Sequence, residues 1–183
     1  AGGNHGTLIN GPVWTSPGKV GGALAFDGGD DYVGLPAAAS SLLSNSAGTI
    51  EAWVKPSAIG DNDIVVAFGT GNSGQGIGLG IFGNVRIYHH ASPYDWQSNT
   101  GVGANEWTFL VYTWDGTTET IYKNGVFSEN RARNFNYVAG NGRLGHGFWG
   151  DAANAFPGAI DEVGTYSRAL TAAEVSDHYE AGL

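Results

Sequence analysis

The C-terminal segment Gly158–Tyr179, GAIDEVGTYSRALTAAEVSDHY, contains the only complete helix start signal in this chain. Thr171 can cap the helix, and Glu174 stands three residues later, which makes a capping box. Leu170 and Val175 occupy the two positions of a hydrophobic staple. The sequence therefore predicts one short helix at the end of this segment, and the remainder of the chain has to fold from strands and turns.

The composition suits many short strands joined by tight turns. Of 183 residues, 31 are glycine, 42% are hydrophobic and only 14% are charged. A chain of this length can bury a full core, and no repeat or linker divides it, so we expect a single domain over residues 1–183. The absence of cysteine excludes disulfides and thiol chemistry.

Alternation of apolar and polar residues marks a series of strands. The segment Thr49–Lys55 places Ile50 and Val54 on one face and Trp53 on the other. The Asn-Gly dipeptide at 124–125 is a hairpin signal, because both turn positions need a positive φ. Antiparallel hairpins at this spacing predict an all-β, two-sheet antiparallel sandwich with the one short helix at its C-terminal end. The other expected strands are Thr7–Ile9, Ala23–Asp27, Tyr32–Leu35, Asp63–Phe68, Gly76–Phe82, Asn84–His90, Trp107–Asp115 and Thr120–Lys123.

The net charge of −9 argues against two classes of partner. Affinity for phosphate comes from clustered lysine and arginine, but this chain has 8 such residues against 17 acidic ones. Neither nucleic acid nor an anionic membrane surface is therefore an expected partner. No apolar run approaches the ~20 residues that span a bilayer, so we expect no membrane insertion. An acidic, lysine-poor, glycine-rich chain without cysteine is typical of a bacterial module that is extracellular, secreted or on the cell surface.

Four sequence blocks occur in the order and spacing of a known family. They are FDGGDDYV at Phe26–Val33, NEWTFLVYTWDG at Asn105–Gly116, TIYKNGVF at Thr120–Phe127 and the C-terminal strand–helix segment. With these blocks the chain resembles the laminin-G-like members of the concanavalin A-like jelly rolls. The resemblance implies a jelly-roll sandwich. It leaves function open, because jelly rolls host lectins, glycan-binding modules, adhesive domains and glycoside hydrolases.

The same resemblance implies a structural Ca²⁺ site. In the family, an acid on the strand that corresponds to the one with Asp161 holds the ion together with the loop after an early strand. That loop is FDGGDD here, in which Asp27, Asp30 and Asp31 supply carboxylates and Gly28 and Gly29 leave carbonyls accessible. The expected ligands within the loop are Asp27, Gly28 and Asp30. Carboxylates and carbonyl oxygens are the ligands that calcium prefers. The alternative is that the loop is only a polar turn and Asp161 a solvated strand residue.

An outward-facing row on the strand Asn84–His90 is the first candidate for ligand binding. Two glycines at 78 and 80 on the preceding strand leave space beside it, and aromatic rings can pack on the C–H faces of sugars. Alternatively, these aromatic side chains cover the edge of the sandwich. The row consists of Arg86, Tyr88 and His90 and continues into Tyr94 and Trp96, with Trp96 expected as an exposed stacking residue.

A second aromatic group lies in the loop before the Asp161 strand. His146 and Trp149, within GHGFWG, are expected to form the opposite wall of the same groove. The bulky Trp149 departs from the small residues that relatives carry in this loop. Simple anchoring of the loop is the alternative interpretation.

The patterns needed for catalysis are missing. Jelly-roll glycosidases place carboxylates two residues apart on one strand, so that two of them flank the sugar. Asp161 and Glu162 are adjacent, which predicts that they point to opposite faces. No G-x-S-x-G signature of a serine hydrolase occurs either. We therefore expect a protein that is not an enzyme.

These observations favour a non-catalytic module that binds a polysaccharide or oligosaccharide. We expect it to be excised from a longer secreted protein and tethered there to other domains, such as those of a polysaccharide-active enzyme or an adhesin. The alternative is a protein–protein or self-association module of a bacterial surface adhesin. A lyase or hydrolase with unusual catalytic residues is a third and less favoured interpretation.

Overall fold

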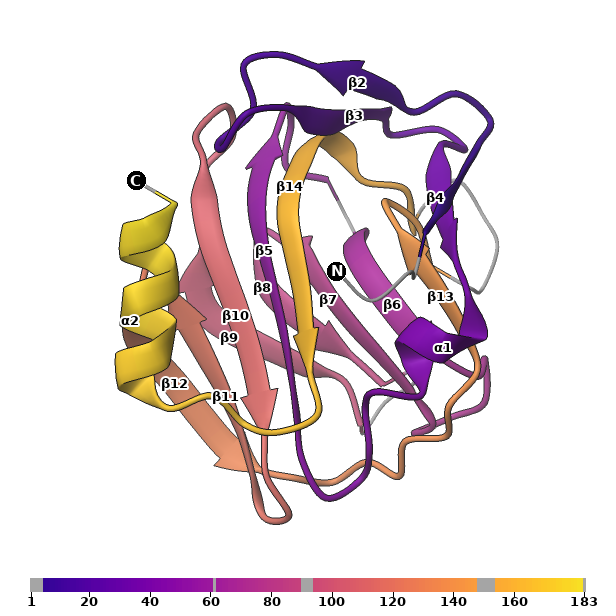
Figure 1. Ribbon diagram of the computed structural model, residues 1–183. Helices are drawn as coiled ribbons and strands as arrows, with labels where there is room; N and C mark the ends of the chain where they lie inside the picture. The colour runs from indigo at the N-terminus through magenta and orange to yellow at the C-terminus, as the bar shows by residue number, and fades with distance from the viewer. Residues whose placement is uncertain (1–4, 61, 90–93, 148–153, 183) are drawn as a thin grey trace.

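A computed structural model describes residues 5–60, 62–89, 94–147 and 154–182, and these ranges form a sandwich of two β-sheets (Figure 1). All neighbouring strands within each sheet are antiparallel. The first sheet contains, in spatial order, β1 (Thr7–Ile9), β4 (Tyr32–Leu35), β13 (Asn141–Leu144), β6 (Asp63–Gly69), β7 (Gly76–Phe82), β8 (Asn84–Tyr88) and β9 (Trp96–Gly101). The second contains β12 (Val126–Ala132), β11 (Thr118–Lys123), β10 (Thr108–Trp114), β5 (Gly48–Pro56), β14 (Pro157–Tyr166), β3 (Ala23–Asp27) and β2 (Val13–Thr15).

The predicted all-β sandwich is thus confirmed, and most expected strands occur within one or two residues of their predicted ends. The dipeptide at 124–125 forms the predicted hairpin turn, with φ of 51° and 78°. Three strands, β2, β9 and β13, and the short helix α1 (Ala37–Ser40) were not predicted, and β12 was implied only by the hairpin signal before it. They carry little apolar alternation, and their pairing with neighbouring strands places them in the sheets.

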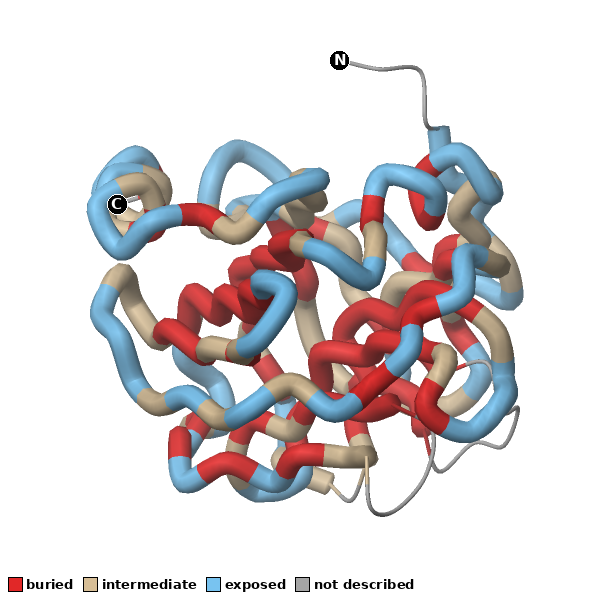
Figure 2. Tube along the Cα trace, turned by 90° about the horizontal axis from the view of Figure 1, so that it is seen from below, coloured by how far each residue is buried: buried red, intermediate tan, exposed pale blue. Residues whose placement is uncertain are grey.

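The main core lies between the two sheets and follows the predicted alternation. Ile50 and Val54 of β5 face Leu79 of β7 and Ile87 of β8 across this core, and all four are fully buried. Figure 2 shows buried chain running through the middle of the molecule, with exposed segments around its margin. Burial of this apolar surface, at roughly 25 cal/mol per Å², supplies the main driving force for folding.

Helix α2 (Ala172–Ala181) packs on the outer face of the second sheet (Figure 1). The predicted capping box is present, with Thr171 and Glu174 bonded reciprocally. A second apolar cluster holds the helix in place, and it includes Trp53 of β5 together with both staple residues, Leu170 and Val175. No helix within the described ranges is long and apolar enough to cross a membrane.

Candidate functional site

The outer face of the first sheet carries the predicted row beside the two glycines. Gly78 pairs with Tyr88, and Gly80 pairs with Arg86, so all four lie on one face. This face is closely packed, since Tyr88 is only 4% exposed, clusters with Ile64 and Ala67, and donates to Asn62 Oδ1. The guanidinium of Arg86 lies 4.8 Å from the centroid of the Tyr88 ring and forms an ion pair with Asp95. His90 lies outside the described residues.

Trp96 belongs to the main core. It is 8% exposed and packs among the buried residues between the sheets. Residues on β9 alternate between buried and exposed, and this alternation turns the Trp96 side chain inward. The prediction that Trp96 is an exposed stacking residue is therefore wrong.

The structure places His146 at a distance from the Arg86 row. Strands β6 and β7 lie between β13, which leads to His146, and β8, which carries Tyr88. His146 is buried, and its ring centroid is 6.1 Å from that of Tyr32. Its predicted partner Trp149 lies outside the described residues. The described side chains of the two groups therefore do not form a single groove.

Tyr94 lines a cavity of ≈ 320 Å³ at one end of the sandwich. This cavity, the Tyr94 pocket, combines one partly exposed aromatic ring with several neutral polar side chains. An added Cβ at Gly74 would lie 3.4 Å from three atoms of the Tyr94 ring, and φ of +72° at this position favours glycine. The described lining residues are Ser73, Gly74, Gln75, Tyr94, Asn134, Phe135 and Asn136.

Three chain segments distant in sequence build the pocket, and backbone hydrogen bonds join them. Asn136 N donates to Gly74 O at 2.8 Å, which links the segment after β12 to the turn between β6 and β7. Gly74 N donates to His89 O at 2.7 Å and ties that turn to the end of β8. The polar side chains of the lining are thus held on a fixed frame.

A buried charged network supports the pocket from the core side. Glu119 of β11 is fully buried and accepts hydrogen bonds from Tyr112 Oη at 3.0 Å and from Arg131 Nη2 at 3.3 Å. His89 Nε2 lies 3.1 Å from the same carboxylate, while His89 Nδ1 lies 3.1 Å from Gly76 O. The charged imidazolium can donate to both acceptors, whereas the neutral ring can donate to only one.

The electrostatics of the network keep its carboxylate ionised. Burial acts to raise the pKa of Glu119. The hydrogen bond from His89 and the positive charges of His89 and Arg131 outweigh burial and lower this pKa below its usual value. Burial first, and then the charge of Glu119, raise the pKa of Tyr112 well above its ordinary value. Tyr112 is therefore a permanent donor to Glu119 near neutral pH.

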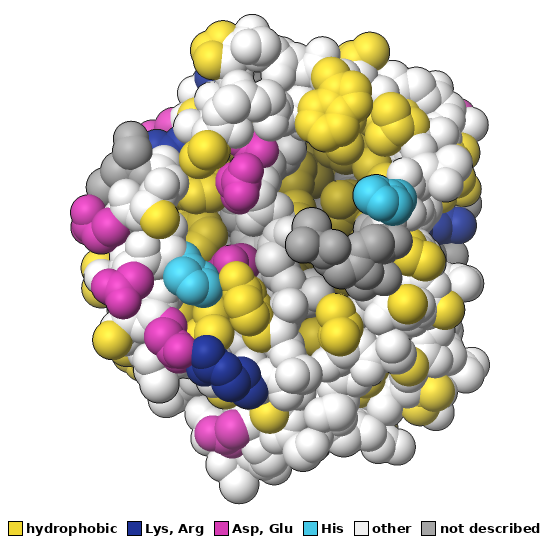
Figure 3. Space-filling view, viewed as in Figure 1, with side chains coloured by type: hydrophobic (Ala, Val, Ile, Leu, Met, Phe, Trp, Pro, Cys, Tyr) yellow, Lys and Arg dark blue, Asp and Glu magenta, His cyan; other side chains and the backbone are white. Residues whose placement is uncertain are grey.

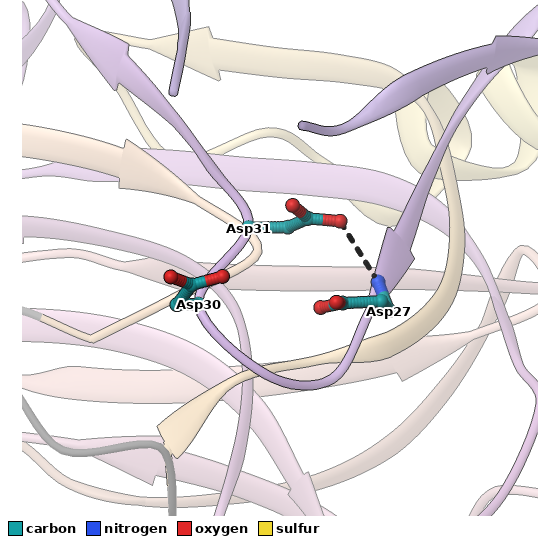
Figure 4. A group of neighbouring side chains, drawn as sticks. All are labelled: Asp27, Asp30 and Asp31. Atoms are coloured by element: carbon teal, nitrogen blue, oxygen red, sulfur yellow. Dashed lines mark hydrogen bonds between the residues drawn. The ribbon is translucent and has the colours of Figure 1, made fainter. Parts of the chain in front are cut away.

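Three of the predicted calcium-loop acids come together between β3 and β4 (Figure 4). The carboxylate oxygens of Asp27, Asp30 and Asp31 lie within 4.8 Å of one another. Asp31 Oδ2 accepts from Asp27 N at 3.1 Å, and Gly28 holds the turn with a φ of +80°. No ion pair within the described ranges neutralises these carboxylates. The oxygen set therefore fits a hard divalent cation.

Asp161 has a different environment from the one that the resemblance implied. Its Oδ2 accepts from Lys19 N at 2.8 Å and from Val20 N at 3.0 Å, and its Oδ1 accepts from Glu162 N. Pro157, rather than Asp161, pairs with Asp27, and Asp161 lies four positions, or about 13 Å of strand, further along β14. Asp161 thus fastens the loop before β3 and does not join the other three acids.

The strand β14 also departs from simple alternation. Its register shifts between Asp161 and Gly164, and Glu162 has a φ of +47° in this bulge. Ile160 and Val163, on either side of the two acids, both pack against the main core, so the bulge breaks the alternation on which the prediction of opposite faces for Asp161 and Glu162 rested.

An apolar hollow opens beside this bulge. Trp14, 72% exposed, lies at its rim, and Leu24, Leu144 and Val163 line both this cavity of ≈ 160 Å³ and an adjoining one of ≈ 340 Å³. Figure 3 shows hydrophobic side chains gathered around a hollow on the face seen in Figure 1. Few polar groups line it, so it offers little to the hydroxyl groups of a sugar.

Another cavity, of ≈ 220 Å³, lies where the end of α2 meets the second sheet. Glu51 accepts from Tyr166 Oη at 2.8 Å and lies 2.9 Å from His178 Nδ1. Burial, and then the bond and charge of Glu51, raise the pKa of Tyr166 to about 12. These polar groups pair with one another, and their contacts dock the helix on the sheet.

The fold defines a jelly-roll sandwich of the lectin type, and comparison with known proteins identifies its family. The sequence of residues 27–176 matches the family model of the concanavalin A-like lectin/glucanases superfamily. The chain therefore belongs to this superfamily, as the sequence blocks predicted. A search of curated proteins found no match.

Solved structures give the same fold. Domain 4 of AbnA, an extracellular arabinanase from Geobacillus stearothermophilus solved with arabinotriose, is 26% identical, with a TM-score of 0.78 over 94% of this chain and 86% of that domain. The botulinum neurotoxin serotype G binding domain is 15% identical, with a TM-score of 0.69 over 99% of this chain and 47% of that one. A pentraxin from Limulus polyphemus is 17% identical, with a TM-score of 0.55 over 71% and 68%.

The placement of Trp96 yields a test by melting. Trp96→Ala should lower the free energy of unfolding by about 3 kcal/mol or more, because it removes a large side chain from the core. Asn99→Ala is the matched control, since Asn99 is an exposed residue of the same strand, and it should change stability by less than about 0.5 kcal/mol. Equal, small effects of both substitutions in denaturant titrations would contradict the placement.

Proposed function

We propose that this protein is a non-catalytic carbohydrate-binding module and that the Tyr94 pocket is its binding site. The observation that carries the proposal is the make-up of the lining: an aromatic ring beside a hydroxyl and three amide side chains. Sugars present C–H faces to aromatic rings and hydroxyl groups to side chains that both donate and accept.

Polar side chains of the lining are accessible to a ligand. Ser73 and Asn136 are exposed, and so is Asn134, whose Oδ1 already accepts from Arg131. Gln75 uses its Oε1 to accept from Thr70 and from Asn72, while its Nε2 has no partner among the described residues. Because the backbone frame holds these groups in place, binding costs little ordering entropy.

The likeness to the arabinanase domain supports the proposed ligand class. That domain was solved with arabinotriose, and it is 26% identical to this chain over nearly the full length. We therefore propose a short oligosaccharide, or the exposed units of a polysaccharide, as the ligand, with arabinotriose as the first probe. Affinities for such a shallow polar site are expected in the micromolar to millimolar range.

The lining also supports a binding role rather than hydrolysis. Glycosidic cleavage uses a pair of carboxylates across the sugar, and no described residue of the pocket lining carries a carboxylate. By analogy with a domain of an extracellular enzyme, we propose that the module is secreted and anchors a larger protein to its polysaccharide.

We further propose a structural Ca²⁺ at Asp27, Asp30 and Asp31. The support is the close approach of three carboxylates without a compensating cation in the described part of the chain. The ion would bridge the ends of β3 and β4 and stabilise this rim of the sandwich. Asp161 is left out of the ligand set.

Removal of the aromatic ring tests the proposed binding site. Tyr94→Ala should weaken binding of arabinotriose by about tenfold or more, because the stacking surface is lost. Its stability should change by less than about 1 kcal/mol, since Tyr94 is only partly buried. Phe127→Ala removes an exposed aromatic ring of β12 and serves as the control, with binding unchanged.

Isothermal titration calorimetry and thermal melts on these two variants and the parent protein measure both quantities. Unchanged affinity in the Tyr94→Ala variant would refute the pocket. If the parent protein binds no sugar and instead associates with itself as its concentration rises, the self-association alternative is favoured.

Chelation tests the calcium proposal. A ligand at 100 times its dissociation constant stabilises the folded state by about 2.7 kcal/mol, so chelator should lower the melting temperature. Asp30→Asn should reduce this response. Asp161→Ala should lower the melting temperature through unpaired amides of the Lys19 loop while the response to calcium remains. Loss of the response in the Asp161 variant and its persistence in the Asp30 variant would instead support a site centred on Asp161.

A further inference from the structure

One cation lies directly against the Tyr94 pocket. Arg131 Nη2 donates to Tyr94 O at 2.5 Å and to Asn134 Oδ1 at 3.2 Å, and both acceptors belong to lining residues. An unbalanced guanidinium at this position would attract the carboxylate of an acidic sugar. The charge of Arg131 therefore bears on which sugars the pocket accepts.

That charge is balanced from the core side. Glu119, fully buried, lies 3.3 Å from Arg131 Nη2 through Oε2 and 3.4 Å through Oε1. Of the other guanidinium donors, Nη1 bonds to Asp95 O and Nε is buried from solvent, while the Arg131 side chain as a whole is 22% exposed. Arg131 thus positions two walls of the pocket while Glu119 offsets its charge from the core side.

The remaining charged groups around the pocket are few. His89 faces Glu119 and stacks on Phe135, with ring centroids 4.1 Å apart. Arg133 lies 4.2 Å from the centroid of the ring of Phe135, a lining residue, and donates to the amide of Asn45, outside the lining, rather than to a carboxylate. All described lining side chains are uncharged, and the protein as a whole carries a net charge of −9.

We propose that the Tyr94 pocket selects neutral sugars over acidic ones and that Glu119 is the specificity-determining residue. This inference rests on the carbohydrate-binding function proposed above. Glu119 does not touch the ligand. It acts through Arg131, whose charge it neutralises while Arg131 holds the backbone of Tyr94 and the side chain of Asn134. A uronic acid in the pocket would meet no charged side chain among the described lining residues and would be repelled by the overall negative charge.

Two trisaccharides that differ in charge test the proposal. Arabinotriose is the neutral probe, and trigalacturonate is the acidic probe. Calorimetric titration of the parent protein at low ionic strength should give tighter binding of arabinotriose. In Glu119→Gln, which keeps the shape and removes the negative charge, the ratio of neutral to acidic affinity should fall by about fivefold or more. Added salt should shrink this change, because it screens charge. Glu180→Gln, on the exposed side of α2, changes the net charge equally and should leave the ratio unaltered.

Arg131→Gln provides a second variant in case Glu119→Gln does not fold. This substitution removes the positive charge of Arg131 and keeps the negative charge of Glu119. The ratio of neutral to acidic affinity should therefore stay the same or rise, even if both affinities drop. An unchanged ratio in folded Glu119→Gln, or a lower ratio in Arg131→Gln, would overturn the proposal. If the parent protein binds neither probe, the proposed function itself fails, and this result appears before any variant is compared.

Discussion

The buried carboxylate of Glu119 is the constraint on which the candidate site depends. Removing a charge from water costs several kcal/mol unless partners compensate it. Here the partners come from three places, with Tyr112 on the neighbouring strand, His89 at the end of β8 and Arg131 on β12. Because His89 also bonds to Gly76 O, and Arg131 to Tyr94 O and Asn134 Oδ1, the groups that satisfy this carboxylate also tie the walls of the pocket together.

The same requirement explains why the pocket lies where it does. Arg131 Nη2 donates a hydrogen bond to Tyr94 O and so holds the segment at Tyr94. Asn134 N donates to Glu119 Oε1, which holds the segment at Asn134. Asp95 adds a second anchor, since its carboxylate accepts from His89 N and from Arg86. Loops that carry binding groups on a rigid sandwich are a common arrangement, and here ionic contacts supply the rigidity.

The sequence predicted the architecture well because apolar alternation and capping are local signals. The strands β3, β4 and β7 and the capped helix α2 were all located by such patterns. The site was harder to predict, because Gln75, Tyr94 and Asn134 meet only through long-range pairing. Of the described residues of the predicted groove, Tyr94 lines the polar pocket. Trp96 points into the core instead. This was missed because β9 lacks an apolar pattern and was not recognised as a strand. The unused signal was the turn-forming composition of residues 70–75, with two glycines and an asparagine, and of residues 133–136, with two asparagines.

The central claim is that sugar binds at the Tyr94 pocket, and nuclear magnetic resonance titration with arabinotriose tests it most directly. We expect backbone amide shifts concentrated at residues 73–75, 94 and 134–136, with little change elsewhere in the assigned spectrum. Shifts centred on the indole of Trp14 and the apolar hollow beside it, or around the Arg86 row, with the amides of the pocket unmoved, would contradict this account.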